Sequence, residues 1–244
     1  MTDLNGNSLR KEHLFFLIGS IALILFLLES LMISLASSYV SWADRNLIQL
    51  VQSGISASGI RLMLSMTQLG SPAAIALLSL LLVVFLISIN KSGAALWFLA
   101  TLLFGSIIVN PLLKQLFGRP RPAIHRILIE SGFSYPSGHA TAATLFFGLL
   151  IILSLRYARQ RLIRIASVLV CGAAILMVML SRVYLGVHYP SDVLAGLLTG
   201  TAIDCFSAGL SLRRSLHIRR YATSGNEVRK GKSAAETQDQ CTSS

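Results

Sequence analysis

Six long apolar runs constrain this chain more than any other feature of its 244 residues. A helix needs about 20 mostly apolar residues to cross a bilayer, and a membrane-spanning segment must satisfy its own backbone hydrogen bonds. The sequence therefore predicts an all-α membrane protein built as a bundle of six transmembrane helices. The predicted spans are 14–36, 72–89, 94–117, 140–155, 165–183 and 193–212.

Charged residues are scarce, at 13% of the chain, and are unevenly placed. A typical soluble domain has about 25%. The net charge of +11 would suit nucleic-acid binding in a soluble protein. Here the basic residues collect at the ends of apolar runs and in the C-terminal tail, as in proteins that set their topology or contact anionic lipids through cations. We therefore expect membrane lipids, and no nucleic acid, as partners.

The basic residues of the short loops predict an orientation for a multi-pass protein of the cell membrane. With six spans they all fall on one side, and the positive-inside rule makes that side cytoplasmic. Loops 118–139 and 184–192 then face outward. The expected division is a cytoplasmic N-terminal tail (1–12), a six-span domain (13–220) and a disordered cytoplasmic tail (221–244). The basic residues concerned are Arg10, Lys11, Lys91, Arg156, Arg159, Arg161, Arg164, Arg213, Arg214, Arg219 and Arg220.

Between the first two spans, residues 43–69 are too polar to cross a membrane. Apolar side chains recur there in two short groups, which predicts two short amphipathic helices on the outer surface. Two roles stay open for these helices: a lid or lipid entrance, or packing over the end of the bundle. The apolar groups are Leu47, Ile48, Leu50 and Val51, then Ile60, Leu62, Met63 and Leu64.

A first polar cluster follows the third span, where charged side chains are costly and usually functional. Lys114 and Arg121 would share one face of a continuous helix, but two nearby prolines interrupt it, so the spacing alone leaves their convergence open. Arg119, Arg121 and Arg126 all depart from the positive-inside rule on this outer side, which anion binding explains. For Arg119 and Arg126 the alternative is contact with lipid headgroups.

The second cluster, Pro136-Ser137-Gly138-His139, stands directly before the fourth apolar run. A helix that begins here presents unpaired backbone amides and the positive end of its dipole, which together bind anions. Ser137 suits the cap position, Gly138 lets the backbone approach a ligand closely, and His139 stands where it can protonate a leaving group. The alternative is an ordinary capped helix with an interfacial histidine.

The third cluster lies between the fifth and sixth apolar runs. Gly186 and Pro190 mark a short break between the two helices, and Pro190 suits the first turn of the new helix. His188 and Asp192 are four residues apart across this break. A carboxylate can hold one imidazole nitrogen and leave the other free to attack phosphorus. The alternative is a His–Asp pair that only stabilises the start of a helix.

Together, the three clusters resemble the signature of the type 2 phosphatidic acid phosphatase superfamily, in its membrane lipid phosphatase branch. That superfamily also includes the vanadium haloperoxidases. All signature positions and spacings match across residues 114–192, and the six-span plan extends the resemblance over most of the chain. The matching residues are Lys114, Arg121-Pro122, Pro136-Ser137-Gly138-His139, Ser181-Arg182, His188 and Asp192.

The resemblance implies a role for each signature residue. His188 would be the nucleophile that forms a phosphohistidine, with Asp192 orienting it. His139 would protonate the leaving oxygen and then activate the water that hydrolyses the intermediate. The family needs no metal, so no cofactor is expected. The phosphoryl oxygens would be bound by Lys114, Arg121, Ser137, Gly138 and Arg182.

The expected activity is hydrolysis of lipid phosphates or diphosphates at the outer membrane interface. Undecaprenyl diphosphate, phosphatidylglycerol phosphate and phosphatidic acid are the first candidates, because related six-span proteins act on them. Two alternatives stay open. One is a lipid phosphotransferase that uses the same phosphohistidine, and the other is a non-enzymatic lipid-binding or transport protein on the same scaffold. The identity of the lipid, the pathway and the oligomeric state are not predicted.

Two acidic residues fall inside predicted spans and outside the signature. Glu29 lies in the first span and Asp204 in the sixth. Ionisable groups at membrane depth are functional candidates by default. Their estimated depths in the membrane differ, so we do not pair them with each other, and we expect each to make structural hydrogen bonds.

Overall fold

The computed structural model describes residues 2–35, 37–123 and 126–214, and every regular element in these ranges is a helix. The predicted disordered tail at 221–244 lies outside the described residues. The helices are α1 Thr2–Leu35, α2 Ser37–Gln52, α3 Ala57–Gln68, α4 Pro72–Ser88, α5 Ser92–Leu103, the π-helical η1 Phe104–Val109, α6 Asn110–Phe117, α7 Gly138–Tyr157, α8 Arg161–Tyr184 and a last helix, Pro190–Arg214.

Five of the described helical segments are long and apolar enough to cross a membrane. The second predicted span corresponds to α4, an apolar helix of 17 residues that is about 25 Å long at 1.5 Å per residue. The predicted all-helical membrane fold is thereby confirmed. The first helix begins at Thr2, so α1 also includes most of the predicted N-terminal tail. The five long segments are Arg10–Leu35, Ser92–Phe117, Gly138–Tyr157, Arg161–Tyr184 and Pro190–Arg214.

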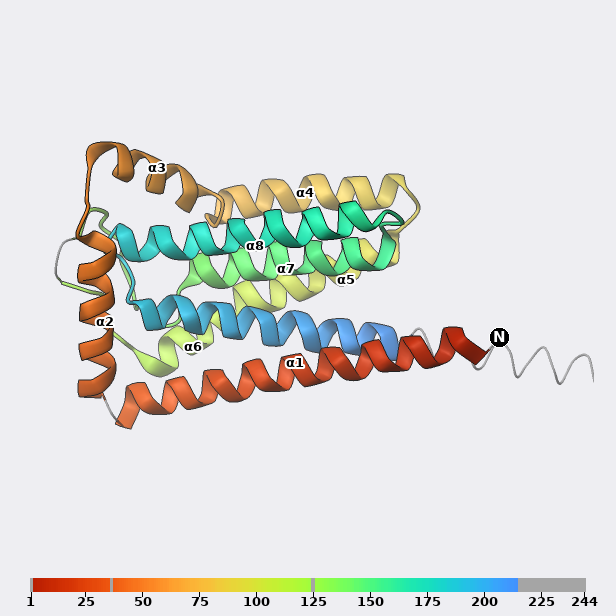
Figure 1. Ribbon diagram of the computed structural model, residues 1–244, viewed down its shortest axis with the longest axis horizontal. Coiled ribbons are helices and arrows are strands. Elements are labelled where there is room, and N and C mark those ends of the chain that lie inside the picture. The colour runs from red at the N-terminus through yellow and green to blue at the C-terminus, as the bar shows by residue number, and fades with distance from the viewer. Residues whose placement is uncertain (1, 36, 124–125, 215–244) are drawn as a thin grey trace, which may run out of the picture.

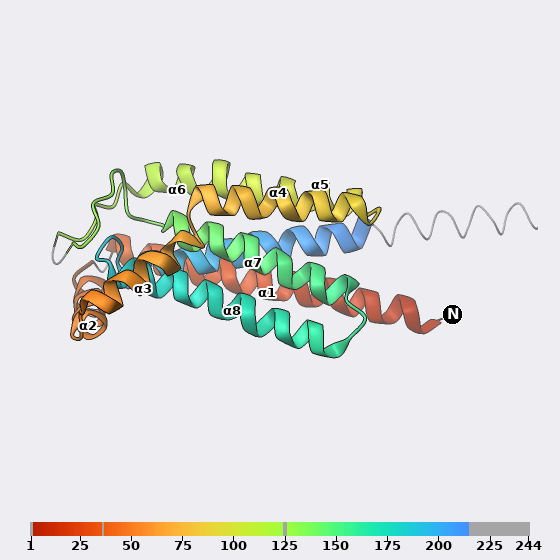
Figure 2. The same ribbon diagram turned by 90° about the horizontal axis from the view of Figure 1, so that it is seen from above.

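The long helices run side by side, and α7 lies between α8 on one side and α4 with α5 on the other (Figures 1 and 2). The last helix packs closely against α7 because it carries glycine where the two backbones meet. A Cβ at Gly196 would lie 2.9 Å from the Ser137 carbonyl oxygen, and one at Gly200 would lie 2.7 Å from Thr144 Cβ. Small residues allow such close helix packing inside membranes. This packing brings the start of α7 beside the start of the last helix.

The segment predicted to be too polar to span forms two helices, as expected. α2 and α3 meet at 117°, and α2 lies across one end of the bundle (Figure 1). Ile48 of α2 is buried against Ala140 and Val183, and the Gln52 side chain donates a hydrogen bond of 3.0 Å to the Tyr184 carbonyl. These contacts correspond to the second of the two predicted roles, packing over the end of the bundle.

The third span contains a π-helical segment, η1, that the sequence analysis did not predict. The Asn110 amide donates to the carbonyl of Gly105, five residues earlier. Pro111 follows directly and has no N–H to give to the helical ladder, which favours a widened turn at this point. Asn110 is buried, and its side-chain amide donates a 3.0 Å hydrogen bond to Thr141 Oγ1 of α7. The segment thereby fixes α6, which carries Lys114, against α7.

Candidate active site

The three polar clusters meet at the end of the bundle that α2 covers. Ser137 is the N-cap of α7, where its Oγ accepts a hydrogen bond from the Ala140 amide, as the sequence predicted. Its own amide donates a 2.9 Å bond to the carbonyl of Asp192 in the first turn of the last helix. The second and third clusters are therefore joined through the backbone as well as through the packing of their helices.

His188 is held by a tight turn after α8. Gly186 has a φ of 71°, a left-handed conformation that glycine adopts without steric cost. The chain reverses there, so that the amides of Val187 and His188 both donate to the Arg182 carbonyl, at 3.2 and 3.3 Å. The imidazole is buried, with 1% of the residue exposed. Its position is thus set by the backbone and not only by the side chain's own contacts.

Asp192 holds one nitrogen of that imidazole. Its Oδ2 lies 3.3 Å from His188 Nδ1 and also accepts a 2.9 Å hydrogen bond from the Tyr189 amide. An ionised carboxylate only accepts, so it favours the tautomer with the proton on Nδ1. Burial lowers the pKa of His188 to about 4, although Asp192 acts in the opposite direction. At neutral pH the ring is therefore uncharged, and its unprotonated Nε2 has a lone pair that faces Arg121.

Three charged groups lie in front of Nε2. The Arg121 Nη1 is 3.1 Å from His188 Nε2 and 3.0 Å from Glu130 Oε2. The other Glu130 oxygen pairs with Nη2 of Arg182, a residue with no exposed surface. Although burial opposes it, the ion pair with Arg182 keeps the pKa of the Glu130 carboxyl below its ordinary value. The two arginines thus already enclose an anion beside the imidazole, and the sequence analysis did not identify Glu130 as that anion.

Lys114 and Arg121 do converge, through the loop and not through a shared helix face. α6 ends at Phe117, so no helix joins the two residues. Lys114 Nζ donates 2.7 Å to the Phe133 carbonyl, and Arg121 Nε donates 3.1 Å to the neighbouring carbonyl of Gly132. The Lys114 side chain also approaches the start of α7, because its Cε would lie 3.8 Å from a Cβ on Gly138.

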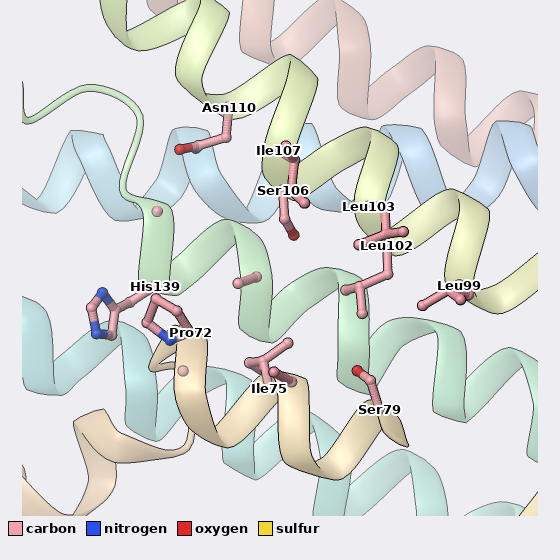
Figure 3. A pocket seen from close by; sticks show the side chains of 14 residues that line it. Pro72, Ile75, Ser79, Leu99, Leu102, Leu103, Ser106, Ile107, Asn110 and His139 are labelled. Carbon is pink, nitrogen blue, oxygen red and sulfur yellow. The ribbon is translucent and has the colours of Figure 1, made fainter. Parts of the chain in front are cut away.

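An apolar cavity of about 480 Å³ begins at His139 and Gly138. It lies between α4, the α5–α6 segment and α7, with His139 and Asn110 at one end (Figure 3). His139 is within electrostatic range of Arg182, Glu130 and His188. The cavity therefore extends from His139 into the apolar interior between the helices. Its other lining residues include Ile75, Leu99, Leu102, Leu103 and Ile107.

One of the outer-side arginines, Arg119, is paired with carboxylates of the protein itself, which corrects the expectation that it binds an anionic ligand or a lipid headgroup. Arg119 donates 2.8 Å hydrogen bonds to carboxylate oxygens of both Asp192 and Asp44. Arg126 donates to the carbonyls of Pro122 and Arg121. Asp44 is not among the residues predicted from the sequence, and its partner Arg119 is 75 residues away in the chain.

The two acidic residues inside the spans do not make the predicted structural hydrogen bonds. Both carboxylate oxygens of Glu29 and both of Asp204 are buried without a hydrogen-bond partner in the described part of the chain. That prediction was wrong for both residues. Among the described residues there is also no group of three or more His, Cys, Asp or Glu side chains arranged to hold a metal ion.

Comparison with known sequences supports the resemblance of the three motifs. The sequence pattern of the PAP2 superfamily matches residues 94–215. Phosphatidylglycerophosphatase B of Bacillus subtilis is 32% identical over 108 residues, 42% of this chain and 51% of that protein. Lipid A 1-phosphatase of Rhizobium johnstonii is 35% identical over 126 residues, 48% of this chain and 46% of that protein. The chain thus spans about half the length of the curated relatives it matches.

Solved structures share the fold. The transmembrane PAP2-type phosphatidylglycerolphosphate phosphatase from Bacillus subtilis superposes with a TM-score of 0.73 at 23% identity, covering 80% of this chain and 96% of that one. LpxE from Aquifex aeolicus superposes with a TM-score of 0.53 at 21% identity, covering 69% of this chain and 93% of that one. At these identities the comparison shows the multi-pass helical fold.

Proposed function

The chain belongs to the PAP2 superfamily, and from that premise we propose that it hydrolyses lipid phosphates or diphosphates through a phosphohistidine. The observation that carries the proposal is the setting of His188. Asp192 holds its Nδ1, and its Nε2 faces the anion-binding guanidinium groups of Arg121 and Arg182. A nucleophile backed by an orienting partner and facing preorganised cations is the arrangement that phosphoryl transfer requires.

In the first step, the substrate's phosphoryl group takes the place that the Glu130 carboxylate occupies between the two arginines. His188 Nε2 attacks phosphorus, and the bond between phosphorus and the leaving oxygen breaks. His139 gives its proton to that oxygen. Lys114, Arg121, Arg182, the Ser137 hydroxyl and the Gly138 amide stabilise the negative charge on the phosphoryl oxygens.

In the second step, His139 removes a proton from water, which attacks the phosphohistidine. The P–N bond breaks, inorganic phosphate leaves and His188 is restored. The proton that His139 gives to the leaving oxygen in the first step is replaced by the proton that it takes from water in the second. The cycle uses residues of this chain alone, which is the reason to expect activity without added metal.

A lipid substrate is supported by the cavity that begins at His139. Its apolar walls can accommodate part of an acyl or polyprenyl chain while the headgroup lies between the arginines. By their names, the two relatives described above act on phosphatidylglycerophosphate and on lipid A. A third relative is decaprenylphosphoryl-5-phosphoribose phosphatase of Mycobacterium tuberculosis. It is 36% identical over 96 residues, which are 38% of this chain and 48% of that protein. Our candidates remain undecaprenyl diphosphate, phosphatidylglycerol phosphate and phosphatidic acid.

The decisive experiment measures phosphate release by the purified protein from these three lipids, with excess chelator present. We expect release from at least one lipid at a rate that the chelator does not change. Loss of turnover with chelator, restored by magnesium, would contradict the mechanism. Radioactive phosphate that appears in an acceptor lipid would favour the phosphotransferase, and release from none of the lipids would favour a lipid-binding protein.

We further propose that the site lies on the extracytoplasmic side, because the arginine-rich 158–164 turn is at the opposite end of the bundle (Figure 1). Single cysteines at Ala123 and at Gln160, in a variant without the three native cysteines, test this. A membrane-impermeant thiol reagent on intact cells should label the first cysteine and spare the second. The reverse pattern would place the site on the cytoplasmic side.

A further inference from the structure

We propose that Asp44 and Arg119 are positioning residues for the nucleophile, so that α2 takes part in catalysis without touching the substrate. The inference rests on the proposed role of His188. A continuous chain of four groups of alternating type runs inward from α2: Asp44, Arg119, Asp192 and His188. The side-chain distances between successive members are 2.8 Å, 2.8 Å and 3.3 Å.

Arg119 joins the two carboxylates with different nitrogens. Its Nη1 donates to Asp192 Oδ1 and to Ser191 Oγ, while its Nη2 donates to Asp44 Oδ2. The guanidinium also lies over the Tyr189 ring, 4.2 Å from the ring centroid. A planar guanidinium group that stacks on an aromatic ring and donates to two carboxylates has little freedom to rotate. Arg119 therefore fixes the direction from which Asp192 Oδ1 is bound.

Asp44, like Asp192, is a buried carboxylate with several hydrogen-bond donors around it. It is 2% exposed, and its two oxygens accept from the Ser191 amide at 3.0 Å, from the Ser191 hydroxyl at 2.7 Å and from Arg119. A buried carboxylate is costly unless it is paired and hydrogen-bonded. Here it has three donors, two of them from the residue directly before Asp192. Asp44 thus holds both Arg119 and the backbone that carries Asp192.

The two carboxylate oxygens of Asp192 have different partners, and this links Arg119 to the orientation of the nucleophile. Oδ2 contacts His188 Nδ1 and accepts a hydrogen bond from the Tyr189 amide, whereas Oδ1 accepts a hydrogen bond from Arg119. If Arg119 loses its anchor on α2, the Asp192 carboxylate can rotate and the imidazole can turn with it. A misplacement of about 1 Å at a reacting group costs on the order of 10²-fold in rate. The proposed phosphate-binding cations are Lys114, Arg121 and Arg182, whereas in the described part of the chain the hydrogen bonds and ion pair of Asp44 go to Arg119 and Ser191.

The test compares Asp44→Asn with Arg45→Gln, an exposed neighbour on the same helix that serves as the matched control. Four quantities are measured for each variant: kcat, KM, the inhibition constant of inorganic phosphate and that of orthovanadate. Vanadate becomes five-coordinate by bonding to a histidine nitrogen, so its affinity reports the placement of His188, whereas phosphate affinity reports the cations. For Asp44→Asn we expect kcat to fall roughly 10–100-fold. We also expect weaker vanadate inhibition and unchanged phosphate inhibition, with Arg45→Gln like the wild type.

A double variant checks that Asp44 acts through Arg119. Arg119→Gln alone should reproduce the loss, and adding Asp44→Asn should cost little more, because neighbours in one network are not additive. Unchanged kcat and vanadate affinity in Asp44→Asn would overturn the proposal. So would an equal loss of phosphate and vanadate affinity, which would place Asp44 in phosphate binding. A lower kcat with both affinities unchanged would indicate only a smaller folded fraction and would also overturn it. Failure of the proposed function would show separately, as a wild-type protein that releases no phosphate.

Discussion

Replacing His188 with alanine is expected to reduce phosphate release by roughly 10⁴–10⁶-fold, the loss typical of removing a nucleophile. The reason is that His188 is the proposed nucleophile, because Asp192 holds Nδ1 of this ring while Nε2 faces Arg121. The phosphoenzyme should disappear with the activity. Both are measured with a lipid carrying radioactive phosphate, by counting released phosphate and by acid-labile label retained on the protein after rapid quenching in alkali.

The control for this variant is His13→Ala, which removes an exposed histidine from the N-terminal part of α1. The N-terminal end of α1 lies opposite the end of the bundle that α2 covers (Figure 1). Its turnover and labelling should equal those of the wild type. Phosphate should still inhibit binding of substrate to the His188 variant, since the cations that hold the anion remain. A phosphoenzyme that persisted without His188 would assign the nucleophile to another residue.

Replacing His139 with alanine is expected to slow hydrolysis of a lipid monoester by about 10²–10⁴-fold, the usual contribution of a general acid. The size of the loss should depend on the leaving group. An alkoxide leaves poorly without a proton, whereas a nitrophenolate or a lipid phosphate leaves well. With p-nitrophenyl phosphate, His188 should still become phosphorylated, and the phosphoenzyme should accumulate because water is no longer activated.

Ser88→Ala is the control for His139, because Ser88 is an exposed residue at the end of α4 and does not line the cavity. It should leave turnover and the leaving-group dependence unchanged. The measurement is the ratio of kcat/KM for the aryl and lipid substrates in each variant. If His139→Ala lowered both substrates equally and trapped no phosphoenzyme, His139 would not be the proton donor.

Features that depend on a few neighbouring residues were predictable. The bilayer requires a fixed length of apolar helix, so the spans could be read from the runs, and the observed Ser92–Phe117 and Arg161–Tyr184 contain the predicted ones. Ser137 was predicted as a helix cap and Pro190 as a residue of the first helical turn, and both positions are as expected. These predictions succeed because capping and proline geometry act within one helical turn.

The site residues themselves were predicted from the order of three motifs, and the packing brings His188, Arg121 and Arg182 together around one point. Their partners were not predictable in the same way. Glu130 meets Arg182 across 52 positions, and it lies in an irregular loop whose spacing carries no periodic signal. The π-helical segment before α6 was also missed, because a widened turn leaves the apolar pattern of a span unchanged.

Local sequence thus determines three properties. Apolar runs set the lengths of the helices, capping residues set where the helices begin, and residue type sets the chemistry available in the loops. The packing of the bundle, in contrast, determines which charged groups meet. From the sequence, Arg119 was expected to bind an anion or lipid headgroups, because its two carboxylates lie 73 and 75 residues away on other elements. Only when α2 crosses the end of the bundle and the last helix packs on α7 do those carboxylates reach it. A buried charge takes the partners that the packing supplies, and that selection is made in three dimensions.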